Sequence, residues 1–209
     1  MKHFLDLGTH RFEGLLEFTE KLNINKDWNV YCYEANPVIY EKALETLDDI
    51  KDNYNNIDFN NLAVMDQDGS ITFHCHDGAW SDTSKEKYVE DYTSGSNALD
   101  QTPAYDIGNG AVFNIVDREV DCIDIDLILS SICSTDPQAE IYIKCDIEGS
   151  EFVVLPRIIE SDYLNNIKQI YIEWHERFWY NNGMEEKIKE KQVYLHHLKK
   201  AGIECFIHG

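Results

Sequence analysis

Residues 141–155 read IYIKCDIEGSEFVVL, and this stretch decides the fold. It opens with β-branched and aromatic residues, which favour a buried strand. The apolar pattern then breaks at Asp146, Gly149 permits a tight turn, and apolar residues resume at Phe152. In α/β proteins, ligands bind outside the carboxyl ends of the strands. We therefore expect the functional site to be built around Asp146.

The rest of the chain alternates between strand and helix patterns. The spacing of apolar residues predicts helices over residues 12–22, 126–133 and 184–201. It also predicts a helix that begins at Asn36 and another that ends at about Glu160. Strands are expected at His3–Leu7, Val30–Tyr33, Ile57–Val64, Ser70–Cys75, Glu119–Ile125, Ile141–Cys145, Lys168–Trp174 and Ile203–Ile207. The turn at residues 66–69 and the strand after it resemble a hairpin. The alternation predicts an α/β fold with a mostly parallel sheet, helices on both faces and a single domain over 1–209.

Charge and cysteine usage exclude several classes of protein. The net charge is −21, from 18 basic and 39 acidic residues, which disfavours nucleic acid and anionic membrane surfaces as partners. No apolar run approaches the roughly 18–20 residues of a membrane span, and the N-terminal residues do not resemble a signal peptide. The six cysteines are spread singly, so neither a zinc ribbon nor a redox pair is indicated. These features predict a cytoplasmic, intracellular protein.

The first strand leads into Asp6-Leu-Gly8, and this turn points to a nucleoside ligand. The dinucleotide pattern G-x-G-x-x-G is absent, and Asp6 would repel a phosphate but suit an ammonium or sulfonium group. Glu34 ends the second strand, 28 residues after Asp6. An acid at that position typically binds both ribose hydroxyls. Together these residues favour a nucleoside ligand that is not a diphosphate, such as S-adenosylmethionine. The absent glycine pattern argues against an NAD-dependent oxidoreductase.

Five motifs, in order along nearly the whole chain, resemble the FkbM-type family of S-adenosylmethionine-dependent methyltransferases. They are FLDLGT at residues 4–9, YEANP at 33–37, NLAV at 61–64 followed by Asp68-Gly69, KCDIEGSE at 144–151, and IEWH at 172–175. The resemblance implies a class I methyltransferase (Rossmann-like) fold and O-methylation of a hydroxyl, often on a sugar or a natural product. The family often has a second glycine near position 12, where this chain has Phe12.

The resemblance also implies cofactor-binding residues. Asp6, Gly8 and Thr9, with His10 added, would line the methionine part of the cofactor, and Glu34 would bind the ribose. Asn61 and Ala63 would lie near the adenine.

The catalytic candidates are Asp146, Glu173 and His175. Alternation along the strands places Lys144 and Asp146 on one side, and Glu173 and His175 on one side of the next strand. If the strands are neighbours, the three candidates converge. Two mechanisms remain open. In the one that we favour, His175 is a general base oriented by the carboxylates.

In the second mechanism, Asp146 and Glu173, with His175, hold Mg²⁺ or Mn²⁺, which lowers the pKa of a sugar hydroxyl. Lys144 is expected to pair with nearby acids. Glu148 and Glu151 are expected to have architectural roles at a helix N-terminus.

Residues 77–115 are the expected acceptor-side insertion. They are polar, and their aromatic residues Trp80, Tyr88, Tyr92 and Tyr105 could stack on sugar rings or form a local core. The predicted function is O-methylation of a hydroxyl of a sugar or glycan. The alternatives are a non-catalytic cofactor-binding subunit of a glycan-building assembly and an RNA ribose methyltransferase, the latter disfavoured by the charge.

Overall fold

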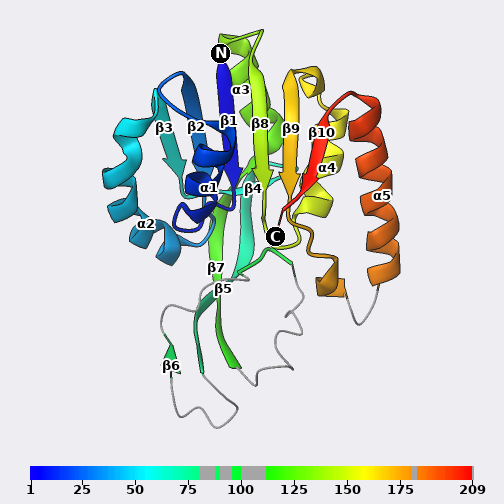
Figure 1. Ribbon diagram of the computed structural model, residues 1–209. Helices are drawn as coiled ribbons and strands as arrows, with labels where there is room; N and C mark the ends of the chain where they lie inside the picture. The colour runs from blue at the N-terminus through cyan, green and yellow to red at the C-terminus, as the bar shows by residue number, and fades with distance from the viewer. Residues whose placement is uncertain (81–87, 90–95, 100–111, 180–182, 209) are drawn as a thin grey trace.

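The computed structural model describes residues 1–80, 88–89, 96–99, 112–179 and 183–208. Its main feature is a six-stranded parallel sheet in the order β10-β9-β8-β1-β2-β3 (Figure 1). The strands are β1 (Lys2–Leu7), β2 (Trp28–Tyr33), β3 (Asn56–Asn60), β8 (Glu140–Cys145), β9 (Ile167–Ile172) and β10 (Glu204–Ile207).

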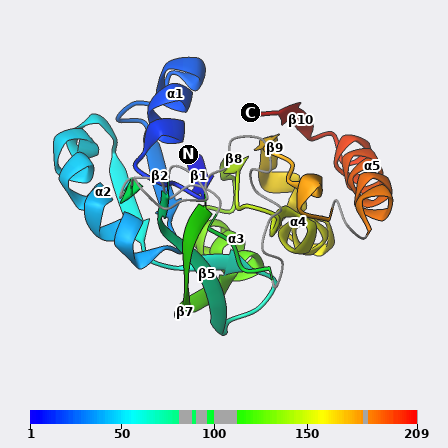
Figure 2. The same ribbon diagram turned by 90° about the horizontal axis from the view of Figure 1, so that it is seen from below.

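Helices cover both faces of this sheet, as the sequence predicts. They are α1 (Glu13–Leu22), α2 (Pro37–Ile50), α3 (Ile125–Thr135), α4 (Glu151–Glu160) and α5 (Met184–Lys200), with short 3₁₀ turns at Lys51–Asn53, Leu164–Asn166 and Glu176–Trp179. Figure 2 shows α1 on one side of the strands and α3 and α4 on the other. The described helices include none that is both long and apolar enough to cross a membrane.

Two apolar cores follow from the alternation of side chains along β1. Phe4 packs with Phe18 of α1 and Ala43 of α2 on one face, whereas Leu5 packs with Leu129 of α3 and Leu155 of α4 on the other. Asp6 shares its side of the strand with Phe4, so its carboxylate lies on the α1 face of the sheet.

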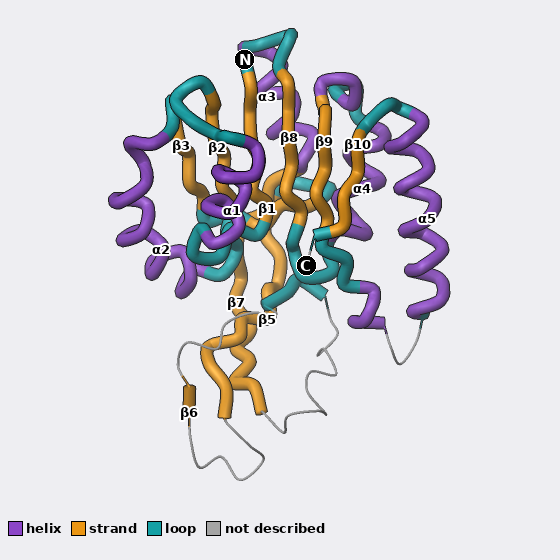
Figure 3. The backbone as a smooth tube through the Cα atoms, in the orientation of Figure 1, coloured by secondary structure: helices purple, strands orange, loops and turns teal. Residues whose placement is uncertain are grey.

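A second sheet, in the order β4-β7-β5-β6, lies beyond the carboxyl ends of the parallel strands (Figure 3). Its strands are β4 (Ala63–Met65), β5 (Gly69–Trp80), β6 (Tyr88–Val89) and β7 (Val112–Asp124). Strands β5 and β7 are therefore longer than the predicted Ser70–Cys75 and Glu119–Ile125. They pair antiparallel over most of their length, with an irregularity between His76 and Ala79.

Two sequence-based expectations about this region are wrong. The single strand expected at Ile57–Val64 is divided into β3 and β4, which belong to different sheets. The division falls at Asn61, whose side chain donates to the carbonyls of Glu34 and Ala35 instead of continuing a strand. The expected hairpin is also absent from the described pairing, because β7 lies between β4 and β5. Strand β4 pairs in parallel with one edge of β7, and β5 pairs antiparallel with the opposite edge.

The strand after the Asp146 turn also ends earlier than expected. Strand β9 stops at Ile172 rather than Trp174, so Glu173 and His175 lie in the segment that follows it. The backbone N–H of Glu173 still donates to the carbonyl of Cys145, at 3.0 Å. This bond keeps the segment alongside the end of β8.

Candidate functional site

A cavity of about 540 Å³ lies where the parallel strands end. Seven of the residues that the sequence nominates line it: Gly8, Thr9, His10, Glu34, Ala63, Asp146 and Glu173. Three others, Asp6, Asn61 and His175, are not among the lining residues. The cavity thus joins the expected cofactor residues to part of the expected catalytic group.

The turn after β1 is packed too closely for any residue but glycine at position 8. Gly8 has a φ of +79°, and a Cβ there would lie 1.8 Å from the carbonyl oxygen of Asp146. The backbone N–H groups of Gly8 and Thr9 both donate to the carbonyl of Tyr33, each at 3.0 Å. The turn therefore fixes the ends of β1, β2 and β8 against one another.

Phe12, at the position where a glycine was expected from the family, also has a left-handed backbone. Its φ is +71° at the start of α1. The side chain is fully buried and its ring lies 4.7 Å from that of Phe59. Packing of the phenyl ring thus holds a conformation that glycine adopts freely.

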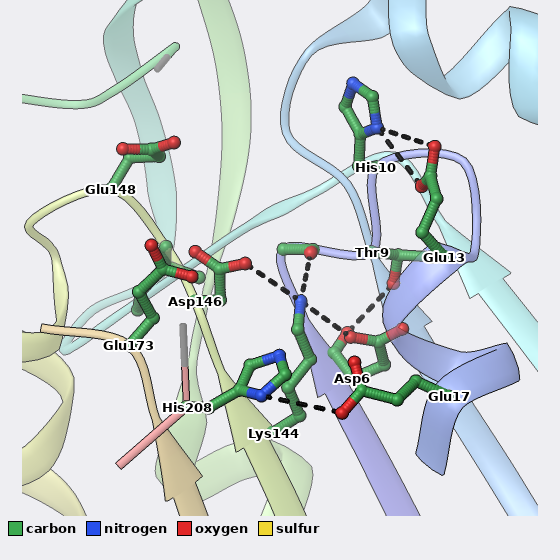
Figure 4. A network of polar contacts seen from close by, with 12 residues as sticks. Asp6, Thr9, His10, Glu13, Glu17, Lys144, Asp146, Glu148, Glu173 and His208 are labelled. Atoms are coloured by element: carbon green, nitrogen blue, oxygen red, sulfur yellow. Dashed lines mark hydrogen bonds and ion pairs between the residues drawn. The ribbon is translucent and has the colours of Figure 1, made fainter. Parts of the chain in front are cut away.

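Asp6, Lys144 and Asp146 form a charged group at the base of the cavity (Figure 4). The Lys144 ammonium lies 3.2 Å from Asp6, 3.3 Å from Asp146, and donates to the Gly8 carbonyl at 2.7 Å. Asp6 is fully buried, and burial raises its pKa although Lys144 lowers it. Burial lowers the pKa of Lys144, but Asp6 and Asp146 outweigh this and raise it. The predicted ion pairing of Lys144 is confirmed.

Glu34 presents its carboxylate at the end of β2. Its two oxygens accept the backbone N–H groups of His10 and Asn36, each at 2.8 Å. Burial raises the pKa of Glu34, and the two hydrogen bonds lower it less than burial raises it. Each carboxylate oxygen has a further lone pair, so the group can still accept from ligand hydroxyls.

Asn61 does not line the cavity itself, although Leu62 and Ala63 next to it do. Its Nδ2 donates to the carbonyl of Glu34 at 2.7 Å, so it holds the loop that carries the carboxylate.

His175 lies within a ring of four carboxylates. Its Nδ1 is 2.9 Å from Glu151, and its Nε2 is 3.1 Å from Glu148, 3.6 Å from Glu173 and 3.8 Å from Asp146. The expected convergence of Asp146, Glu173 and His175 is therefore present in the structure.

The raised pKa of His175 follows from these neighbours. The side chain is only 1% exposed. Burial lowers the pKa of His175, but Glu148 and Glu151 outweigh burial and raise it to about 10. Glu173 lies at the cavity, and burial together with the charge of Asp146 raises its pKa.

Glu151 combines the expected architectural role with a second one. Its two oxygens accept the backbone N–H groups of Ile147 and Gly149, each at 2.9 Å, which closes the turn before α4. One of these oxygens also contacts His175. Because Glu151 is fully buried, it links the turn rigidly to the histidine.

A comparison with protein families identifies the family of this chain. Residues 6–199 match the family model of the methyltransferase FkbM domain. The chain belongs to the FkbM methyltransferase family.

The FkbM fold is also found among solved structures. The crystal structure of methyltransferase FkbM from Methylobacillus flagellatus KT superposes with a TM-score of 0.50 at 12% sequence identity. The match covers 92% of this chain and 38% of that one, so the present chain corresponds to little more than a third of its neighbour. At this identity the likeness shows the fold alone. A comparison with curated proteins found no match.

Several residues at the FkbM cavity were missed by the sequence analysis. Glu13 and Glu17 of α1 line it, as does His208 after β10, whose ring lies 3.9 Å from Glu17 (Figure 4). The position of Glu13 and Glu17 at the cavity could have been predicted, because acids in the first turns of α1 follow the Gly8 turn directly. The position of His208 could not have been predicted, because it lies at the cavity only through the place of β10 in the sheet order.

The expected acceptor-binding aromatics are not placed by the structure. Tyr92 and Tyr105 lie outside the described residues, and for Trp80 and Tyr88 only the backbone is described. Phe73 of β5 and the segment 96–99, through Ser96 and Ala98, do reach the cavity. The Oγ of Ser96 accepts the backbone N–H of His76 at 2.9 Å and lies 3.2 Å from the Asn36 side chain. This segment therefore connects the second sheet to the loop that carries Glu34.

Proposed function

We propose that this FkbM-family protein is an S-adenosylmethionine-dependent O-methyltransferase that acts on a hydroxyl of a sugar or glycan. One observation carries the proposal. A single cavity is lined by the Gly8 turn and Glu34 on one side and by the carboxylates of Asp146 and Glu173 on the other. A methyl donor and a hydroxyl that must lose a proton need these two kinds of group side by side.

The residues present suit the cofactor. The Gly8 turn lines the cavity without a side chain, and Glu34 offers free lone pairs for ribose hydroxyls. S-adenosylmethionine, when bound, supplies an activated methyl group. Thr9 and His10 would face its methionine part and Ala63 its adenine. Asp6 and Asn61 would act indirectly, Asp6 through Lys144 and Asn61 through the Glu34 loop.

The acceptor hydroxyl must lose a proton during methyl transfer, and we assign the proton acceptor to Glu173. With a pKa of about 10, His175 carries a proton at neutral pH and is poorly suited to accept another, contrary to the mechanism favoured by the sequence. Glu173 lies at the cavity and its raised pKa makes it a better base than an ordinary carboxylate. A positioned base contributes about 10²–10⁴ in rate. Asp146, held by Lys144, would position the hydroxyl.

A metal-assisted reaction is the alternative. Mg²⁺ or Mn²⁺ held by Asp146, Glu173 and His175 would lower the pKa of the hydroxyl.

The second sheet and the 77–115 region are proposed as the acceptor side of one methyltransferase domain spanning 1–209. The support is that Phe73, Ser96 and Ala98 reach the same cavity. An RNA ribose as acceptor is disfavoured by the net charge of −21, because phosphate binding depends on basic residues. A glycan without phosphate has no such requirement.

Calorimetry with S-adenosylhomocysteine tests cofactor binding. The purified protein is expected to bind it at micromolar concentrations, and Glu34→Ala is expected to weaken binding by about 10-fold or more, because ribose hydroxyls lose a charged acceptor. The exposed Glu45 of α2 gives a matched control, and Glu45→Ala should leave the affinity unchanged. Absence of binding by the unmodified protein would contradict the proposal.

Mass spectrometry of products from a panel of free and glycan-linked sugars tests the reaction. A methylated sugar is the expected result. Cofactor binding without methylation of any acceptor would instead favour a non-catalytic subunit of a glycan-building assembly. RNA binding that weakens with added salt would favour the RNA ribose alternative.

A further inference from the structure

The Nε2 atom of His175 faces several carboxylate oxygens but forms no hydrogen bond of regular geometry with any of them. The side chain is 1% exposed, and its Nδ1 is occupied by Glu151 at 2.9 Å. Within the described part of the chain, Nε2 has no partner of hydrogen-bond geometry, although a Glu148 oxygen lies 3.1 Å from it. A buried ring nitrogen held towards two or three carboxylates is a common ligand arrangement for a metal ion.

We propose that Asp146, Glu148 and His175 form a binding site for a divalent cation. One donor atom from each of these residues lies within 4.8 Å of the other two, a spacing that one ion at their centre can bridge after small adjustments. The set differs from the one expected from the sequence, because Glu148 replaces Glu173. Two carboxylates and one imidazole suit Mn²⁺ or Mg²⁺ better than a thiophilic metal.

The groups behind these three ligands are arranged to hold them. Glu151 accepts from the far side of the His175 ring and is itself fixed by two backbone N–H groups. Lys144 lies 3.3 Å from Oδ2 of Asp146, whereas it is Oδ1 that faces His175. A carboxylate behind a histidine ligand fixes the ring orientation and raises the ligand's basicity. His175 and Asp146 therefore each have one side fixed by the protein and the other turned towards the common centre.

The local charge also favours a cation. Four carboxylates surround His175, and Lys144, the ammonium nearest to Asp146, is shared with Asp6. A bound divalent ion would offset the mutual repulsion of these acids.

The role of the ion rests on the proposed function. The ion would hold the acceptor hydroxyl at the cavity wall and lower the pKa of that hydroxyl. Glu173, which is not in the ligand set, would remain available to take the proton.

Electron paramagnetic resonance of Mn²⁺ with the purified full chain, in the absence of any cofactor, tests the site. We expect one bound Mn²⁺ per chain. Glu148→Gln is expected to weaken binding by at least about 10-fold, and Glu151→Gln by about 10–100-fold through its effect on His175. Glu173→Gln should weaken it less than Glu148→Gln. Glu17→Gln, which removes an exposed acid from another wall of the cavity, should leave the affinity unchanged.

Two outcomes would overturn the site: no Mn²⁺ binding, or binding that Glu17→Gln weakens as much as Glu148→Gln. A larger effect of Glu173→Gln than of Glu148→Gln would overturn the ligand set. Calorimetry with S-adenosylhomocysteine in EDTA separates this proposal from the proposed function. Cofactor binding without Mn²⁺ binding would remove only the cation site, whereas Mn²⁺ binding without cofactor binding would remove only the proposed function.

Discussion

Phe12 shows how a residue other than glycine can hold a left-handed conformation in the turn before α1. Non-glycine residues in the left-handed region are disfavoured by roughly 1–2 kcal/mol. The φ of +71° persists because the ring is fully buried against Phe59. The loop shape is therefore held by the apolar core under α1 rather than by backbone freedom.

In a helix or strand, an alanine variant is usually more stable than a glycine variant. Substitutions at Phe12 should reverse this order of stability. Both Phe12→Ala and Phe12→Gly lose the buried ring, at a cost of about 3–5 kcal/mol. Only alanine keeps the left-handed strain, so Phe12→Gly is expected to be the more stable variant by roughly 0.5–1 kcal/mol after the entropy of glycine is subtracted. Urea unfolding measures the difference. Leu15, also fully buried in α1, is the control, and there the alanine variant should be the more stable.

Residue spacing predicted part of the site and could not predict the rest. The distances around His175 confirm that Asp146 and Glu173 lie beside it. The proximity of Glu148 depends on its own left-handed backbone, with a φ of +50°, which no residue pattern indicates. The pKa of His175 depends on burial and on two neighbours together, and neither can be inferred from one residue type.

At the scale of elements, the junction of β1, β8 and α1 depends on one buried ammonium. Lys144 of β8 contacts Asp6 of β1, the Gly8 carbonyl and Asp146. Gly14 of α1 lies against its side chain, since a Cβ there would come within 2.8 Å of it. Removing one partner of a buried ion pair is costly, because the remaining charge has lost its compensation.

Lys144→Met is therefore expected to destabilise the protein by about 3–5 kcal/mol, because Asp6 stays buried without its partner. Adding Asp6→Asn to that variant should recover part of the loss, since the buried charge is then removed. Thermal unfolding of the two single variants and the double variant measures the coupling. Lys26→Met, at an exposed position, should change stability by less than about 0.5 kcal/mol. Effects of the two buried substitutions that simply add would contradict the coupling.

The order of elements was more predictable than their pairing. Apolar periodicity indicated β1, β8 and all five helices, because these elements bury a regular pattern against one sheet. It failed between β3 and β4, where Asn61 interrupts the run and the chain crosses to the second sheet. Local sequence carries little information about which strand becomes a neighbour, so the parallel pairing of β4 with β7 was not foreseen.

For the whole molecule, the dominant property is its acidity. The chain has 39 acidic and 18 basic residues, which gives a net charge of −21. The buried ion pairs at the cavity are shielded from salt, but the exposed acids repel one another through water. This repulsion opposes the compact state and is relieved when the chain unfolds, so the surface charge reduces stability without altering the fold.

The midpoint of thermal unfolding should therefore rise when salt is added. Between ionic strengths of about 0.01 M and 0.15 M the screening length falls from about 30 Å to about 8 Å, which weakens repulsion between distant exposed acids. The increase should be the same in sodium chloride and in choline chloride if screening is the cause, because choline cannot occupy a small carboxylate site. An increase in sodium chloride alone would point to specific cation binding. A decrease in both salts would mean that exposed ion pairs outweigh the repulsion among the excess acids.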